Sequence, residues 1–199
     1  KMIIWSVKPD LYKAPSQKEK DRLSKMKPFF QDHPAVREAL RMKSKYEPIK
    51  LISHTYRYNS TFVPYLQNIL MPNDSYEYGG YQPLKGTNKD MKIFNRQWKE
   101  KYDGQAERAF RNTVERCKQC GVQLVFVLVP RYEVAEYSDL KSYKSLKKIA
   151  QVNDILFIED FYQNDSLMKP EYFKDILHMN SVGAPIFTRM LASRMASGE

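Results

Sequence analysis

Hydrophobic positions in the second half of the chain alternate between runs of strand length and runs with helical spacing. Residues 122–129 and 155–158 are almost continuously apolar, which is typical of strands buried on both faces. Helical spacing precedes, separates and follows them, in residues 105–120, 138–152 and 184–195. Helices that alternate with buried strands through short connections predict a parallel sheet covered by helices.

The beginning of the chain carries a strand pattern followed by a polar stretch. Residues 2–7 are apolar and predict a buried strand that leads into a loop at Pro9. Because a buried strand is an unusual first element, we interpret the 199 residues as one domain from the C-terminal part of a longer protein. Pro34 opens a helix pattern, since proline is tolerated in the first turn of a helix.

The middle of the chain predicts a helix and then a long loop. Residues 60–70 place apolar side chains at helical spacing, whereas residues 73–88 are rich in glycine, proline, tyrosine and asparagine. Long loops inside a compact domain are often functional. Tyr76, Tyr78 and Tyr81 are therefore candidates for the wall of a sugar or acyl site, and packed surface side chains are the equal alternative.

Composition narrows the classes of function. Hydrophobic residues make up 42% of the chain and charged residues 28%, which is typical of a globular protein. No apolar run approaches the roughly 20 residues that span a bilayer, so we expect no membrane span. The net charge of +10 would suit nucleic acid, but no zinc-finger or RNA-binding motif accompanies it. We therefore interpret the charge as solvated helix faces and expect no nucleic-acid partner.

The two cysteines, Cys117 and Cys120, form a CxxC at the end of a predicted helix, just before Gly121. A redox CxxC is typically placed at a helix N-terminus, where the thiolate is stabilised. A zinc site needs two further ligands at similar spacing, and the sequence offers none. We expect these cysteines to pack a helix end, and we expect no metal and no cofactor.

Candidate chemistry is concentrated at His178, which follows the last predicted strand and precedes the last helix. Catalytic groups gather in such loops, beyond the C-terminal ends of parallel strands. Asp175 stands three positions earlier, and a carboxylate beside an imidazole fixes its tautomer and stabilises the imidazolium. An imidazole held in this way can take the proton of a serine nucleophile. Of the other histidines, His33 is interpreted as a turn residue and His54 as a surface residue.

Residues 175–183 read DILHMNSVG and resemble the D-x-L-H-x-N-x-x-G block of SGNH/GDSL hydrolases. The resemblance implies a three-layer α/β/α fold of flavodoxin-like type with a mostly parallel sheet. It implies that Asp175 orients His178 and that His178 is the general base. The activity it implies is that of an esterase or acyl transferase acting on a small-molecule or carbohydrate ester. Family analogy favours a place outside the cytoplasm, in the periplasm or cell envelope.

The chain departs from the family in its first half. It contains no Gly-Asp-Ser and no Gly-x-Asn-Asp, so the nucleophilic serine is expected to lie outside these residues. Some bacterial members carry long insertions between the serine block and the DxxH block, which would account for residues 15–88. Asn59 is a candidate oxyanion donor, but we favour a helix N-cap, a role that suits both Asn59 and Ser60. Asn180 is a candidate for oxyanion or turn support.

Two other classes of function stay open. A catalytically inactive hydrolase-fold domain could bind a glycan or act as a scaffold, using the loop of Tyr76 to Tyr81. A basic nucleic-acid-binding protein would show a contiguous positive face. The sequence upstream of Lys1 would discriminate the first alternative, and retention on heparin at high salt would discriminate the second.

Overall fold

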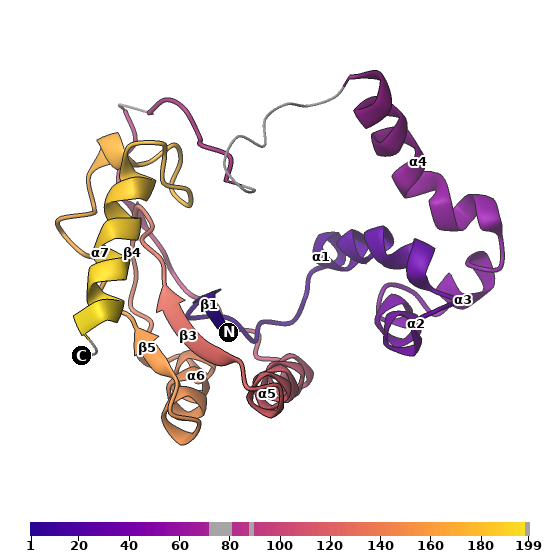
Figure 1. The fold of residues 1–199 in the computed structure, drawn as a ribbon, viewed down its shortest axis with the longest axis horizontal. Helices are drawn as coiled ribbons and strands as arrows, with labels where there is room; N and C mark the ends of the chain where they lie inside the picture. The colour runs from indigo at the N-terminus through magenta and orange to yellow at the C-terminus, as the bar shows by residue number, and fades with distance from the viewer. Residues whose placement is uncertain (72–80, 88–89, 198–199) are drawn as a thin grey trace. The chain divides into compact units, whose positions relative to one another are not determined.

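The structure of the protein is a computed structural model, drawn in Figure 1. It describes residues 1–71, 81–87 and 90–197. Contacts divide the chain into two compact units. The sheet unit comprises Lys1–Ala14 and Pro83–Glu199, and the helical unit comprises Pro15–Gln82. The helical unit coincides with the stretch that the resemblance assigns to an insertion, so the interpretation of the chain as one domain stays a prediction.

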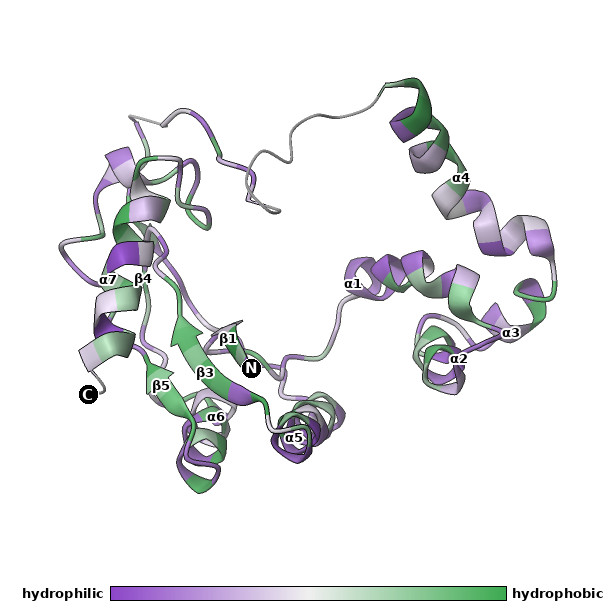
Figure 2. Cartoon of the chain, viewed as in Figure 1, coloured by the Kyte–Doolittle hydropathy of each residue, from purple (hydrophilic) through white to green (hydrophobic). Residues whose placement is uncertain are grey.

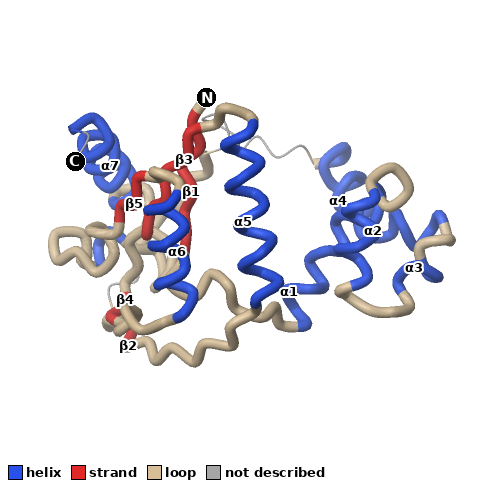
Figure 3. Tube along the Cα trace, turned by 90° about the horizontal axis from the view of Figure 1, so that it is seen from below, coloured by secondary structure: helices blue, strands red, loops and turns tan. Residues whose placement is uncertain are grey.

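The sheet unit is built on three parallel strands (Figure 3). They are β1 (Met2–Val7), β3 (Gln123–Leu128) and β5 (Leu156–Ile158), in the order β1-β3-β5. β3 lies in the centre and pairs with both neighbours, with Met2 opposite Gln123 and Val125 opposite Leu156. The predicted strands and their parallel pairing are thereby confirmed.

Three helices cover this sheet. They are α5 (Gly104–Gln119), α6 (Lys141–Val152) and α7 (Gly183–Ser197). Leu124, Phe126 and Leu128 of β3 pack in one core cluster with side chains of α5 and α6. Val125 and Val127 point to the other face and pack in a second cluster with α7. After the polar Gln123 at its start, β3 is apolar and buried from Leu124 to Leu128 (Figure 2). The α/β fold with a parallel sheet is confirmed.

Side chains outside the helices fix where α5 and α6 begin. The Asp103 carboxylate accepts the backbone N–H of Gln105 at 2.8 Å and caps α5. Gly121, with φ of 63°, follows the end of α5, as predicted for a C-terminal glycine. The Glu100 carboxylate accepts the N–H groups of Lys141 and Ser142, each at 2.8 Å. α6 therefore begins three residues later than the predicted start.

β1 is less buried than predicted. Met2, Ile3 and Ile4 are 49%, 45% and 49% exposed, and only Val7 at the end of the strand is buried. The expectation of a buried strand was wrong for these residues. Within the described ranges β1 pairs with β3 alone, so its other edge carries no strand.

A second, smaller sheet links two loops of the sheet unit. β2 (Phe94–Asn95) pairs in parallel with β4 (Glu133–Val134). The pairing continues at Arg96, whose backbone N–H donates to the carbonyl of Val134 at 2.8 Å. Segments far apart in the sequence are thus held together just after β3.

The described residues of the helical unit form five short or medium helices. They are α1 (Gln17–Asp21), η1 (Arg22–Phe29), α2 (Pro34–Arg41), α3 (Glu47–Lys50) and α4 (His54–Leu70). Val36, Leu40 and Leu51 form a small buried cluster between them. The predicted helix start at Pro34 is confirmed. No helix of the described residues is long and apolar enough to cross a lipid bilayer.

α4 begins earlier than the sequence predicted. Ser53 is its N-cap, and the Ser53 hydroxyl accepts the backbone N–H of Tyr56 at 3.4 Å. Asn59 lies inside the helix with its side chain exposed, so the interpretation of Asn59 and Ser60 as N-caps was wrong. The apolar spacing begins only near Phe62, whereas the hydrogen-bonded helix starts a full turn and more before it.

Candidate acid–base site

Asp175 and His178 lie in a tight turn between η2 (Pro170–Tyr172) and α7. Phe173 and Met179 form an antiparallel bridge, and the Lys174 N–H donates to the His178 carbonyl at 2.9 Å. These two contacts close the turn at its base. The side chains of Asp175 and His178 are thereby held on a short, hydrogen-bonded loop.

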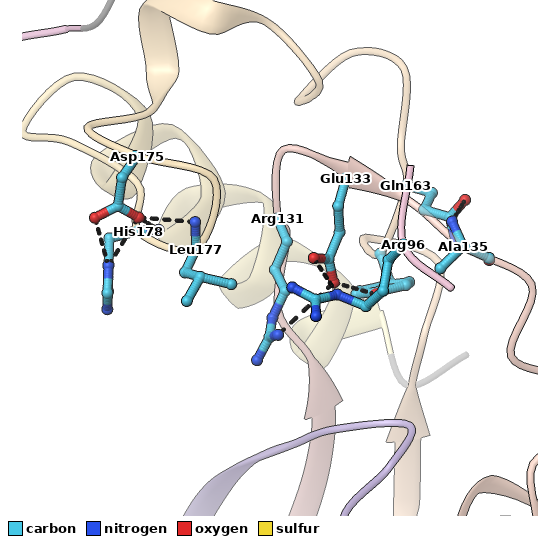
Figure 4. A network of polar contacts seen from close by, with 9 residues as sticks. Arg96, Arg131, Glu133, Ala135, Gln163, Asp175, Leu177 and His178 are labelled. Atoms are coloured by element: carbon cyan, nitrogen blue, oxygen red, sulfur yellow. Dashed lines mark hydrogen bonds and ion pairs between the residues drawn. The ribbon is translucent and has the colours of Figure 1, made fainter. Parts of the chain in front are cut away.

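The two side chains point toward one another (Figure 4). His178 Nδ1 lies 2.9 Å from both carboxylate oxygens of Asp175. Asp175 Oδ1 also accepts the backbone N–H groups of Leu177 and His178, at 2.8 and 2.9 Å. Because a carboxylate can only accept, Nδ1 carries the hydrogen and a neutral ring keeps its lone pair on Nε2. Nε2 has no hydrogen-bond partner among the residues described.

The turn favours the ionised form of Asp175. Partial burial raises the pKa of the carboxyl group, but the hydrogen bonds from His178 and from the backbone of Leu177 and His178 outweigh it. The net effect holds the pKa of Asp175 below its usual value near 3.8. At neutral pH the carboxylate is charged, and the His178 side chain is 60% exposed. The pair can therefore accept a proton on Nε2 and stabilise the resulting imidazolium.

The turn is joined to the loop that follows β3. The Tyr132 backbone N–H donates to the carbonyl of Ile176 at 3.0 Å. Figure 4 shows His178 and Arg131 on neighbouring loops, with both side chains pointing the same way. Since Arg131 follows the carboxyl end of β3, the Asp175–His178 pair lies at the edge of the parallel sheet where ligands usually bind.

A buried carboxylate that the sequence analysis missed lies on the same loop. Glu133 is fully buried, and its carboxylate accepts Arg96 Nε at 2.6 Å and the Tyr162 hydroxyl at 2.7 Å. Arg131 Nη1 lies 3.7 Å from the same carboxylate. Burial, together with the hydrogen bond to Glu133, raises the pKa of Tyr162. Two guanidinium groups share one carboxylate, so the cluster carries an excess of positive charge.

Only a short stretch of the sequence could have indicated this cluster. Arg131 and Glu133 are charged residues placed directly after a buried strand and Pro130. Charged residues at that position are candidates for a site. Arg96 could not have been paired with them, because it joins only through the contact of β2 with β4.

Asn180 supports the turn into α7. It is 2% exposed, and its amide donates to the Glu171 carbonyl at 2.8 Å. Its side-chain oxygen accepts the N–H groups of Val182 and Gly183 at 2.9 and 3.0 Å. A Cβ at Gly183 would lie 2.3 Å from the carbonyl oxygen of Tyr172, so only glycine fits there. Of its two predicted roles, Asn180 has the contacts of turn support, and its amide is already engaged.

The remaining predicted site residues lie outside the described part of the sheet unit. Asn59 and Tyr81 belong to the helical unit, and both side chains are exposed. Tyr76 and Tyr78 lie outside the described residues. The structure therefore joins Asp175, His178 and Asn180 in one turn, and the roles suggested for the other residues stay predictions.

The cysteines lie where the sequence placed them. Cys117 is near the end of α5 and Cys120 is its C-cap, and neither forms a disulfide. Cys120 is exposed and Cys117 packs at the edge of the core. In the part of the chain that the structure describes, no group of three or more His, Cys, Asp or Glu side chains could hold a metal ion.

Comparison of the chain with protein-family models, curated proteins and solved structures finds no match in any of the three. Membership of the SGNH/GDSL family therefore stays a prediction that rests on residues 175–183.

Proposed function

We propose that Asp175 and His178 are the acid–base half of an SGNH/GDSL-type serine hydrolase. The observation that carries the proposal is the 2.9 Å contact of His178 Nδ1 with the Asp175 carboxylate, which leaves Nε2 open to solvent. A pair that only capped a helix would not need the imidazole aligned on the carboxylate. The place of the turn beside the loop after β3 supports the same interpretation.

The reaction is acyl transfer from an ester. A serine hydroxyl attacks the acyl carbon while His178 Nε2 takes the hydroxyl proton, and Asp175 stabilises the imidazolium that forms. The imidazolium then gives this proton to the leaving alcohol, which yields an acyl-serine. Water or a second alcohol releases the acyl group by the same proton path in reverse order. The serine is proposed to lie outside the 199 residues, and the ester is proposed to be an acylated carbohydrate or another envelope ester.

The test separates the two halves of the site. The 199-residue chain is expected to hydrolyse p-nitrophenyl acetate no faster than its His178→Ala variant and to resist labelling by a fluorophosphonate. The longest natural chain that contains these residues is expected to label on a serine. In that chain His178→Ala should lower kcat by about a thousandfold or more. Asn112→Ala, on an exposed face of α5, serves as a control that should leave kcat unchanged.

Two results would contradict the proposal. One is esterase activity of residues 1–199 that survives His178→Ala. The other is a natural chain whose serine labels and turns over normally in the His178→Ala variant.

A second candidate function is a glycan-binding domain without catalysis. The observation that favours it is a groove of about 580 Å³ that the Trp98 ring shares with polar side chains, among them Asn95, Gln97 and Ser138. An indole ring beside amide and hydroxyl groups suits a sugar. Binding of an oligosaccharide that Trp98→Ala abolishes and His178→Ala leaves unchanged would favour this function.

A further inference from the structure

α4 exposes a set of large apolar side chains, which we call the α4 surface. Its members are Tyr58, Phe62, Val63, Tyr65, Leu66, Ile69, Leu70 and the following Met71, with exposed fractions from 41% to 78%. Figure 2 shows the apolar colour gathered toward the end of this helix. Exposed apolar residues are common singly, but a contiguous set of this size indicates an interaction surface.

The α4 surface carries no charge of its own. Residues 58–71 contain no Asp, Glu, Lys or Arg, and their polar members are Asn, Ser, Thr and Gln. Thr61 and Asn68 stand seven positions apart on one side of the helix, and most of the apolar positions lie on the other side. The helix has 17 residues and is not apolar enough to cross a bilayer. An amphipathic helix of this kind suits a position in the plane of a membrane surface.

Positive charge surrounds the start of α4. Lys27 Nζ lies 3.7 Å above the ring of Tyr56, and Lys43 and Lys50 lie 3.7 and 3.5 Å from the Glu47 carboxylate. Two lysines thus share one carboxylate there, and a third lies against the ring of Tyr56, whose hydroxyl donates to the same carboxylate. Over residues 15–71 as a whole, eleven lysines and arginines stand against five acidic residues. The helical unit therefore favours an anionic partner.

We propose that the α4 surface binds the surface of an anionic lipid bilayer. Phe62, Leu66 and Ile69 would enter the boundary between headgroups and acyl chains, and the hydroxyl of Tyr65 would stay at headgroup level. Lysines of the helical unit would contact the lipid phosphates. A second copy of this chain is a poorer occupant, because two positive helical units would face each other. The proposal does not depend on Asp175 or His178.

The experiment is flotation of the 199-residue chain with vesicles. One set contains only phosphatidylcholine, and the other contains equal parts of phosphatidylcholine and phosphatidylglycerol. The wild-type chain should float with the anionic set at low salt and bind it about tenfold more tightly than the neutral set. Leu66→Ser with Ile69→Ser should weaken binding to the anionic set by about tenfold or more, since both side chains are exposed and apolar.

Two matched variants sharpen the test. Asn59→Ser with Gln67→Ser changes two exposed polar positions of the same helix and should leave flotation unchanged. Lys25→Glu with Lys45→Glu reverses two exposed charges and should weaken binding to the anionic set alone. Circular dichroism of each variant should match the wild type, which shows that the helices are retained.

Three results would overturn the proposal. Wild-type chain that floats with neither set has no affinity for lipid. If Leu66→Ser/Ile69→Ser and Asn59→Ser/Gln67→Ser lose lipid binding equally, the α4 surface is not the contact with the bilayer. The third result combines two measurements. Light scattering finds a dimer that the Leu66→Ser/Ile69→Ser variant has lost, and the wild-type chain binds the anionic set no more tightly than the neutral set. These findings together would assign the α4 surface to self-association.

Discussion

Glu133 and Asp175 are carboxylates on neighbouring loops, yet the protein holds them in opposite ways. Glu133 is fully buried and is bound by Arg96, Arg131 and Tyr162 from three separate segments. Asp175 is 52% exposed and takes all its described hydrogen bonds from the two residues Leu177 and His178. The Glu133 carboxylate joins three separate segments of the fold, whereas the Asp175 carboxylate is held by hydrogen bonds from within its own turn. A site that must meet a substrate belongs to the second type.

This difference predicts that removing the charge lowers the free energy of unfolding by more at Glu133 than at Asp175. A buried carboxylate leaves its cationic partners unpaired when it is lost, whereas an exposed one is replaced by water. Three substitutions, taken from the largest expected effect to the smallest, can break or sharpen the contrast.

Glu133→Gln should lower the free energy of unfolding of the 199-residue chain by about 3 kcal/mol or more. The amide cannot neutralise Arg96 and Arg131, whose side chains are 25% and 13% exposed. Urea unfolding followed by circular dichroism measures the effect. Glu136→Gln, three residues away and exposed, is the matched control and should change stability by less than about 0.5 kcal/mol. Equal effects of the two variants would remove the contrast.

Asn180→Ala should have an intermediate effect, a loss of about 2 kcal/mol in the free energy of unfolding. Asn180 combines the two types, because it caps its own turn and also bonds the carbonyl of Glu171 while buried. Its removal leaves that carbonyl and the N–H groups of Val182 and Gly183 without these partners. Asn112→Ala on exposed α5 is the control, and the same urea curves compare the two. A loss no greater than that of the control would contradict this role.

Asp175→Asn should have the smallest effect, below about 1 kcal/mol at neutral pH, since solvent screens the exposed pair. Because the folded state lowers the pKa of Asp175, its carboxylate stabilises the fold above the unfolded pKa. That stability is lost as pH falls through the folded value. The stability difference between wild type and variant should therefore vanish under acid conditions.

Urea midpoints measured from neutral to acid pH test this dependence. His178→Gln retains the backbone donors to Asp175 and should show part of the pH dependence. A difference between wild type and Asp175→Asn that stays constant as the pH falls would show that the carboxylate is not stabilised by the turn.

The sequence predicted the elements that are determined by residues close to one another in the chain. β3 was recognisable because residues 124–128 are apolar on both faces of a strand. Asp175 and His178 were recognisable because they stand three positions apart, so that one turn suffices to align them. The carboxylate's bonds to Leu177 and His178 are likewise made within the same turn.

What the sequence did not predict depends on distant contacts. Arg96 and Glu133 are 37 residues apart and meet only because β2 pairs with β4. The exposure of Ile3 and Ile4 depends on which strands flank β1, and no local pattern reports that. The start of α4 was misplaced because Ser53 caps a first turn whose apolar spacing is weak. Periodicity reports which side chains are buried, and a helix can begin before its apolar positions do.

The position of β1 at the edge of the described sheet has a consequence for amide exchange. A strand paired on one side donates alternate backbone N–H groups to its neighbour and points the others outward. The amides of residues 2–7 should therefore exchange with deuterium in an alternating slow and fast pattern, whereas consecutive amides of β3 should all be slow. The same outward groups, beside the apolar Ile3 and Ile4, form a template for unwanted strand pairing at high concentration. Ile3→Lys would be expected to improve solution behaviour without disturbing the core.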